Sequence, residues 1–273
     1  MGEQYFIGVD GGGTTCRARV CDTSGRPLGE GVAGPANPRI GIDAAHAEIL
    51  KACDAALRDA GIPRAAFRRI HAGLGLAGVG QPRERDLVLA RPYPFAGVSV
   101  DTDAYAACLG AHGGRDGAIV SVGTGTASLA LVGGRRTVAG GWGFEVSDDG
   151  SGAFLGREAV RRSLWAHDGT AASTPLARAV MDRFAHRPED VVAWVGSARP
   201  RDYAALAPLV LEHAALCDPL ALDVVGEAAG HVSRLVARMF AAGAPAVCLL
   251  GGLAAPLGKW LPPSLRDRLR APE

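Results

Sequence analysis

Aromatic residues make up only 5% of the 273 positions in this sequence, and no long block of basic residues occurs in it. The charges nearly cancel, since 29 Lys and Arg stand against 28 Asp and Glu and leave a formal net charge of +1. Domains that bind nucleic acids usually carry a basic patch for the phosphates and often aromatic rings that stack on bases. We therefore expect no nucleic-acid partner.

Long hydrophobic runs are also missing. Gly, Arg or Asp interrupts every apolar stretch before it reaches the roughly 20 residues that span a bilayer. Residues 1–6 lead directly into an apolar strand pattern, without a positively charged leader or a small-residue cleavage site. These absences predict a cytoplasmic protein with no membrane partner.

The six cysteines form no Cys-x-x-Cys pair and no cluster with histidine at the spacing of zinc ligands. Because they are dispersed through apolar segments, we interpret them as reduced thiols in the core. The sequence also lacks the P-loop pattern, the His-Arg-Asp loop of protein kinases and the His-Glu-x-x-His zinc helix. Those routes to ATP binding or to hydrolysis are excluded.

What the sequence does contain is a glycine-rich turn that occurs twice, as Asp10-Gly11-Gly12-Gly13-Thr14-Thr15 and as Gly123-Thr124-Gly125-Thr126. Each turn joins two predicted strands and a third follows, at 5–10, 16–21 and 28–33 in the first case and at 118–122, 127–132 and 137–140 in the second. This recurrence indicates an internal duplication.

Helical patterns and further strands follow each three-stranded unit. Ile49, Cys53 and Leu57, at four-residue spacing, predict an amphipathic helix over 43–60. Further helices are predicted at 151–165, 175–185, 203–215 and 220–242, and further strands at 70–76, 98–101 and 246–250. This order predicts an α/β protein with two lobes, residues 1–114 and 115–273, and a central cleft as the ligand site.

The first glycine turn has the composition of a phosphate-binding loop. Glycine can take positive φ and bring backbone N–H groups against an anion, and threonine hydroxyls add donors. We expect Gly12, Gly13, Thr14 and Thr15 to contact phosphate. Asp10 would hold Mg²⁺ or its waters, because a carboxylate that faces phosphates needs a cation between them. A tight hairpin turn without a ligand is the alternative.

The second turn, with Gly123, Thr124 and Gly125, is short enough to be an ordinary loop, and its place in the duplicate is what favours phosphate contact. Asp103 lies where a predicted strand ends and a helix begins. It could simply cap that helix. A carboxylate at this end of a strand also faces the crevice where α/β proteins bind ligands, and could accept a proton from an attacking hydroxyl.

Two further segments leave alternatives open. In residues 140–152, Trp142 could stack on a sugar ring and Asp148 could accept its hydroxyl hydrogen bonds, or the two could be a core residue and a helix-start acid. Residues 73–78 match the dinucleotide fingerprint G-x-G-x-x-G, but Pro82 and a charged run follow. We favour backbone that lines the cleft over an NAD site.

Together these motifs resemble the actin-like ATPase superfamily, with its duplicated ribonuclease H-like fold. Within it the chain resembles the BadF/BadG/BcrA/BcrD ATPase and N-acetylglucosamine kinase family, and most of all its bacterial glucosamine kinases. The resemblance covers almost the whole chain and is carried by residues 11–19, Thr102-Asp103-Ala104-Tyr105, residues 108–112 and Ser147-Asp148-Asp149-Gly150-Ser151-Gly152.

The resemblance implies phosphorylation of the 6-hydroxyl of an amino sugar by ATP with Mg²⁺, in two lobes that close around the substrates. Asp103 would be the general base, and Gly12, Gly13, Thr14 and Gly125 would hold phosphates. The sugar pocket would include Asn37, Asp103, Thr124, Gly141, Trp142 and Asp148. Gly251 and Gly252 would bound the adenosine site, unless they form an ordinary strand-to-helix turn. We also expect a homodimer.

The loop after Asn37 bears on which sugar is used. It contains Pro38-Arg39, where N-acetylglucosamine kinases typically have an aromatic residue beside the acetamide. This difference favours glucosamine, whose ammonium group Glu145 or Asp148 would pair with.

Other functions remain open at this point. They are an N-acetylglucosamine kinase, a BadF-type ATPase that activates a redox partner, and a sugar sensor without turnover. The dispersed cysteines disfavour the redox activator, because such activators share an iron–sulfur cluster in a dimer. An Asp at position 103 disfavours the sensor.

Overall fold

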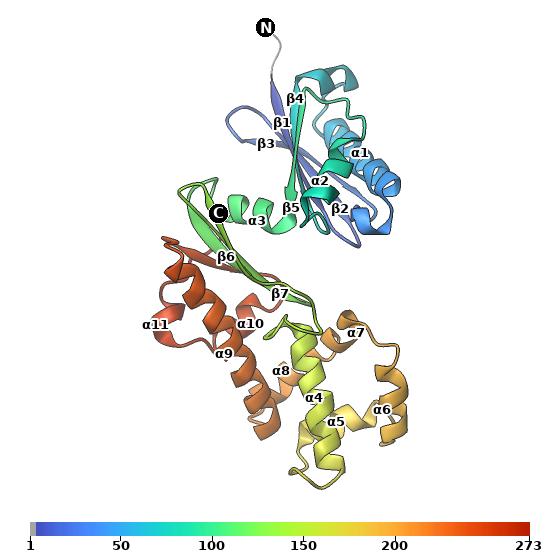
Figure 1. Cartoon of the computed structure of the whole chain (residues 1–273), viewed down its shortest axis with the longest axis vertical. Helices are drawn as coiled ribbons and strands as arrows, with labels where there is room; N and C mark the ends of the chain where they lie inside the picture. Colours follow the sequence, from blue (N-terminus) through green and yellow to red (C-terminus); the bar gives the residue numbers. More distant parts are fainter. Residues whose placement is uncertain (1–3) are drawn as a thin grey trace. The chain divides into compact units, whose positions relative to one another are not determined.

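A computed structural model describes residues 4–273 of the chain. It divides into two compact units, Met1–Gly110 and Ala111–Glu273, both drawn in Figure 1. The division falls within helix α3 (Asp103–Ala111). The boundary expected from the sequence, between residues 114 and 115, lies just beyond it, and the central cleft stays a prediction.

The first unit contains a five-stranded sheet in the order β3-β2-β1-β4-β5. The first three strands form an antiparallel meander, and β4 and β5 are parallel to β1. The strands are β1 (Tyr5–Gly11), β2 (Cys16–Cys21), β3 (Pro27–Ala33), β4 (Ile70–Leu76) and β5 (Gly97–Thr102).

The second unit repeats this order in a four-stranded sheet, β8-β7-β6-β9, with β9 parallel to β6. Its strands are β6 (Gly117–Val122), β7 (Thr126–Val132), β8 (Arg135–Gly140) and β9 (Val247–Leu250). A parallel bridge from Val247 to Leu269 lies on the side of β9 where the first sheet has β5. The shared order confirms the duplicated ribonuclease H-like fold that the sequence predicts.

Helix α1 (Ile42–Asp59) covers one face of the first sheet (Figure 1). Ile49, Cys53 and Leu57 are all buried, as their spacing predicts. The helix approaches β3 so closely that a Cβ at Gly31 would lie only 2.1 Å from the carbonyl oxygen of Ala52. Glycine at this position therefore allows the contact. The other helical segments of this unit are η1 (Pro38–Ile40), η2 (Arg64–Arg69), α2 (Pro82–Leu89) and α3.

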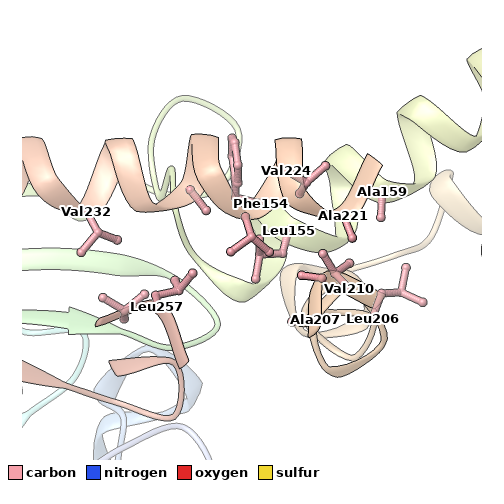
Figure 2. Close-up of a cluster of buried hydrophobic side chains, with 14 of the residues drawn as sticks. Phe154, Leu155, Ala159, Leu206, Ala207, Val210, Ala221, Val224, Val232 and Leu257 are labelled. Atoms are coloured by element: carbon pink, nitrogen blue, oxygen red, sulfur yellow. The ribbon is translucent and has the colours of Figure 1, made fainter. Parts of the chain in front are cut away.

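The second unit is rich in helices: α4 (Gly152–His167), α5 (Pro175–Asp182), α6 (Pro188–Val195), α7 (Pro200–Ala204), α8 (Ala207–Ala215), α9 (Pro219–Ala241), α10 (Ala254–Gly258) and α11 (Pro263–Arg266). Five of these eight begin with proline. Proline suits the first helical position because an N–H at that position would have no partner within the helix. Figure 2 shows their core, in which Phe154 and Leu155 of α4 lie near Val210 of α8 and Val224 of α9.

The helices expected in the second unit differ from those of the structure at two places. The helix expected at 203–215 is two helices, α7 and α8, because Pro208 has no N–H to continue the hydrogen-bond ladder from α7. Helix α6 was not predicted. Its Val192 and Val195 are exposed, so the apolar residues of this short segment do not gather on one face.

The cysteines are free thiols, but the prediction that all of them lie in the core is wrong. Cys16, Cys53, Cys108 and Cys248 are buried, whereas Cys21 is half-buried and Cys217 is exposed. Burial raises the pKa of Cys16 to about 12, so this thiol is not ionised near neutral pH.

Within residues 4–273 no individual helix has the length and apolarity needed to cross a membrane. The segments Pro200–Ala215 and Pro219–Ala241 reach them only when taken together, and they are bent by 115° relative to each other.

The contact between α4 and α7 is tight enough to predict a large effect on stability. A Cβ at Gly156 would lie 1.9 Å from the carbonyl oxygen of Tyr203. We expect Gly156→Ala to destabilise the fold by about 3 kcal/mol, because backbone rather than a flexible side chain must move. Thermal unfolding measures this. Gly226→Ala in α9 is the matched control, since a Cβ there meets nothing within 4 Å. It should stabilise the protein by about 0.5–1 kcal/mol, and an equal loss in both variants would contradict the steric explanation.

Candidate functional site

In the first unit, the parallel strands β1, β4 and β5 end at the same edge of the sheet. Asp10 of β1 lies beside Gly75 of β4, which lies beside Asp101 of β5. Asp103 follows two residues after Asp101 at the start of α3. A Cβ at Gly75 would lie 2.4 Å from the Cβ of Ala106, so glycine allows α3 to pack against this edge and bring Asp103 there.

Asp103 does not cap helix α3. The hydroxyl oxygen of Thr102 accepts a hydrogen bond from the N–H of Tyr105 at 3.1 Å, which is the N-cap interaction. The capping alternative for Asp103 is therefore wrong. Its Oδ1 accepts only the N–H of the next residue, Ala104, at 2.8 Å among the hydrogen bonds of the described chain. The carboxylate of an exposed residue is left available at the edge of the sheet.

Asp10 and Asp103 influence each other. Although Asp10 is an exposed residue, its pKa is raised, first by partial desolvation of the carboxyl and second by the negative charge of Asp103. Arg17, directly opposite on β2, lowers it by a smaller amount. Two carboxylates that repel each other at one edge form a place where a cation is favourable.

The donor set fits Mg²⁺. Within residues 4–273 no group of three or more His, Cys, Asp or Glu side chains is arranged to hold a metal ion. Magnesium is commonly bound by one or two carboxylates together with substrate phosphates and water, rather than by a full protein cage. Asp10, an oxygen donor in a site with excess negative charge, matches that requirement.

The first glycine turn is a tight hairpin. The N–H of Gly12 donates to the carbonyl of Thr15 at 2.9 Å, so Gly13 and Thr14 form the tip. None of the three glycines has positive φ, so that part of the expectation is wrong. Gly11 is required by packing, because a Cβ there would lie 2.5 Å from Leu76 Cδ2. A Cβ at Gly13 would meet nothing within 4 Å, so the described residues leave the space beside it open.

A backbone hydrogen bond connects the segment that contains Asn37 to this hairpin. Its neighbour Ala36 donates to the carbonyl of Gly12 at 2.9 Å. Its own Oδ1 accepts the N–H of Arg39 at 3.0 Å and so caps η1. A Cβ at Gly78 would lie 2.3 Å from that Oδ1. Asn37 therefore sits between the hairpin and the end of β4.

The dinucleotide fingerprint is not realised. Gly73 and Gly75 lie inside β4, and the next helix begins at Pro82. A dinucleotide site needs these glycines in a turn that opens directly into a helix. Here Gly75 makes room for α3, and Gly78 has φ +87°.

In the second unit, the turn at Gly123, Thr124 and Gly125 is joined to the start of α4. The carbonyl of Gly123 accepts the N–H of Gly152 at 2.8 Å, and that of Thr124 accepts the N–H of Ala153 at 3.2 Å. A Cβ at Gly123 would meet nothing within 4 Å, and the residue does not have positive φ. As at Gly13, neither backbone nor packing requires glycine there.

Gly251 and Gly252 lie beside this turn. Gly251 has φ +92°, and a Cβ on it would lie 2.4 Å from the carbonyl oxygen of Val122, the residue before Gly123. The same carbonyl accepts the N–H of Leu253 at 3.0 Å. Gly251 is thus required by conformation and close approach, as a strand-to-helix turn would need, whereas a Cβ at Gly252 would meet nothing within 4 Å.

Asp148 also lies against the second turn. Its carboxylate accepts the N–H groups of Thr126 and Gly143, and a Cβ at Gly125 would lie 2.7 Å from its Oδ2. Burial, and to a smaller extent the charges of Asp149 and Glu145, raise the pKa of Asp148 despite these hydrogen bonds. Ser151, whose hydroxyl accepts the N–H of Phe154 at 3.1 Å, caps α4. The first turn of α4 contains no acidic residue, so the helix-start alternative for Asp148 is wrong.

The remaining predicted sugar-binding residues belong to the same loop. Trp142 is 74% exposed, which rules out the core alternative. Glu145 is exposed as well. Gly141 has φ +77° and lies against Ala127, the second residue of β7. The second unit thus brings Thr124, Gly125, Gly141 and Asp148 together, with Trp142 and Glu145 on the outer part of the loop.

Two features of these regions were not predicted. Thr102 is the cap of α3, although a threonine at a strand end carries an N-cap signal that could have been read. Arg157 of α4 contacts the loop at Phe144 and Asp149. No spacing signal links these residues, because the contact joins a loop to a residue on the second turn of the helix that follows it.

Comparison with known proteins gives a consistent result. A model described as the BadF/BadG/BcrA/BcrD ATPase family matches residues 7–263. Glucosamine kinase GspK of Vibrio cholerae is 38% identical over 269 residues, which cover 98% of this chain and 92% of that protein. N-acetyl-D-glucosamine kinase of Dictyostelium discoideum is 28% identical, over 86% of this chain and 79% of its own length.

A solved structure is similar over the same extent. The crystal structure of a proposed N-acetylglucosamine kinase from Chromobacterium violaceum has a TM-score of 0.88 and 39% identity, and the match covers 99% of this chain and 95% of that one. Sequence and structure therefore indicate the same group of relatives.

Proposed function

Because this chain belongs to the BadF/BadG/BcrA/BcrD ATPase family, we propose that it is an ATP-dependent amino-sugar kinase that converts glucosamine to glucosamine 6-phosphate. A glucosamine kinase is 38% identical to it over nearly the whole chain. The observation that carries the chemistry is the pair Asp10 and Asp103, whose charges influence each other where three parallel strands end, while Thr102 caps the helix.

Asp103 is the general base in this proposal. The 6-hydroxyl oxygen of the sugar forms a bond to the γ-phosphorus of ATP, and the bond from that phosphorus to the ADP oxygen breaks. The hydroxyl proton passes to Asp103, whose carboxylate makes no capping bond that would compete. In such a transfer a protein acts mainly by positioning the reactants and neutralising charge, and a proton acceptor beside the hydroxyl adds to this.

Gly12, Gly13, Thr14, Thr15, Gly123, Thr124 and Gly125 bind the phosphates in this proposal, and Gly251 and Gly252 bound the adenosine. The open space beside Gly13 and Gly123 supports the assignment, since glycine is not needed there for the fold itself. Asp10 would hold Mg²⁺, which neutralises phosphate charge when bound. Asn37, Thr124, Gly141, Trp142, Glu145 and Asp148 bind the sugar.

A preference for the free amine rests on charge. Asp148, Asp149 and Glu145 are close enough for the charges of the last two to raise the pKa of Asp148. A protonated amine relieves this repulsion, whereas an acetamide does not. N-acetylglucosamine phosphorylation is the second candidate, favoured by the relative from Dictyostelium discoideum.

An ADP-release assay with glucosamine, N-acetylglucosamine, glucose or no sugar tests the proposal. We expect kcat/KM for glucosamine to exceed that for N-acetylglucosamine by about tenfold or more, the size of one charge-assisted hydrogen bond. Equal values would remove the support for a free amine. ADP release that does not depend on any sugar would instead indicate an ATPase, and no release at all would indicate a sensor.

A further inference from the structure

The loop at residues 141–150 needs to be held in place by its surroundings. Four of its residues, Gly141, Gly143, Asp148 and Gly150, have positive φ. Glycine-rich segments lose much conformational freedom when they adopt one geometry. The loop nevertheless carries Asp148 and Glu145, which the proposed function assigns to the sugar.

Arg157, on the second turn of α4, contacts this loop at two separate points. Its guanidinium lies over the ring of Phe144 at 5.3 Å, and its Nη1 is 3.5 Å from the carbonyl oxygen of the same residue. Its Nη2 lies 3.9 Å from Oδ1 of Asp149. Phe144 directly precedes Glu145, and Asp149 directly follows Asp148. The two contact points therefore flank Glu145 and Asp148 in the sequence.

The position of the guanidinium is itself fixed. It stacks over Phe154 of α4 at 5.5 Å as well as over Phe144. Each contact point has a further partner, since Phe144 packs on Tyr203 of α7 at 5.0 Å and Asp149 faces His231 of α9 at 3.7 Å. Arg157 contacts both points, so that one planar cation, which also lies against the ring of Phe154, links the two ends of the segment.

We propose that Arg157 is a positioning residue for sugar recognition, which holds Phe144 and Asp149 so that Glu145 and Asp148 keep a fixed separation. The inference deepens the proposed function and rests on it. Arg157 itself does not bind the sugar. Its effect on the substrate is indirect and passes through the loop.

A purely structural role for Arg157, as the partner of a buried acid, is the competing explanation. Glu158 is 2% exposed, and Nε of Arg157 lies 3.4 Å from its Oε1. However, Arg161 at 2.5 Å and Arg162 at 3.6 Å also pair with Glu158. The buried carboxylate therefore keeps two partners when Arg157 is removed, and the variant should fold.

Steady-state kinetics of Arg157→Ala test the proposal. We expect KM for glucosamine to rise by about 10- to 100-fold, the size of a lost contact to a charged group. KM for ATP and kcat should change little, because the loop binds the sugar equally in the ground state and the transition state. Arg157→Lys keeps the charge but loses the planar stack, and it should give an intermediate KM.

Arg161→Ala is the matched control. Arg161 pairs with the same Glu158 and stacks on Trp165 at 5.0 Å, away from the loop. The Arg161→Ala variant should leave KM for glucosamine unchanged. Equal increases in both alanine variants, or an increase in KM for ATP as large as that for the sugar, would overturn the proposal.

Amide hydrogen exchange separates this inference from the proposed function. We expect faster exchange over residues 143–149 in Arg157→Ala and not in Arg161→Ala, whether or not a sugar is phosphorylated. Unchanged exchange in Arg157→Ala would overturn the positioning role even in an active kinase. If the wild-type protein phosphorylates no sugar while the exchange difference is present, the proposed function fails and the contact of Arg157 with the loop stands.

Discussion

Replacing Asp103 with Asn is expected to lower kcat by about a hundredfold or more, the usual cost of losing a general base. Asn has nearly the same shape but cannot accept a proton from the sugar hydroxyl. The helix should be unaffected because Thr102 caps α3, and the Asn oxygen can still accept the N–H of Ala104. ADP release with saturating glucosamine measures the effect, and ATP affinity and thermal unfolding should remain near those of the wild type.

Asp101→Asn is the matched control for this experiment. It removes a carboxylate two residues away, at the end of the same strand, while its side-chain oxygen can still accept the N–H of Thr102 as Oδ1 of Asp101 does at 2.8 Å. We expect a much smaller change in kcat. A near-normal rate for Asp103→Asn, or equal losses in the two variants, would count against Asp103 as the base.

Asp10→Asn is expected to change activity and stability in opposite directions. Activity should fall by about a hundredfold, because this carboxylate is the proposed ligand for the cation that neutralises the phosphates. The magnesium concentration needed for half-maximal activity should rise. Thermal unfolding should shift to a higher temperature, because Asn removes a partly buried charge that Asp103 repels.

The sign of the stability change follows from the raised pKa of Asp10. Ionisation of a carboxyl whose pKa is higher in the folded state than in the unfolded state costs stability. That cost develops as the pH rises from the unfolded pKa through the folded one, and it persists at neutral pH. The gain from Asp10→Asn should therefore be absent in strong acid, where the carboxyl is protonated in both states. A variant that is less stable at neutral pH would contradict this account.

Much of the fold follows from local patterns in the chain. The four-residue spacing of Ile49, Cys53 and Leu57 predicts the buried face of α1, and all three are buried. The repeated strand–turn–strand pattern predicts a duplication, and both sheets have the same strand order. These predictions succeed because hydrophobic periodicity and turn chemistry act over a few neighbouring residues.

Other features of the structure could not be predicted from local patterns in the sequence. Arg157 reaches Phe144 and Asp149 across a turn of α4, and no spacing along the chain encodes that contact. The exposed position of Cys217 and the exposed ring of Trp142 contradict their apolar character. In each case packing between distant elements, rather than residue type, decides which atoms solvent reaches.

The sequence by itself determined the class of fold, the two glycine turns and the choice of Asp103 as a candidate base, because each depends on residue types at short spacing. Only the tertiary structure decided that Thr102 rather than Asp103 caps α3, and that Asp10 and Asp103 approach each other closely enough for their charges to interact. The approach of Asp10 and Asp103 depends on three strands, two of them distant in sequence from the first, ending at one edge of a sheet. Long-range pairing of that kind is set by the packing of the whole unit and is not contained in any local segment.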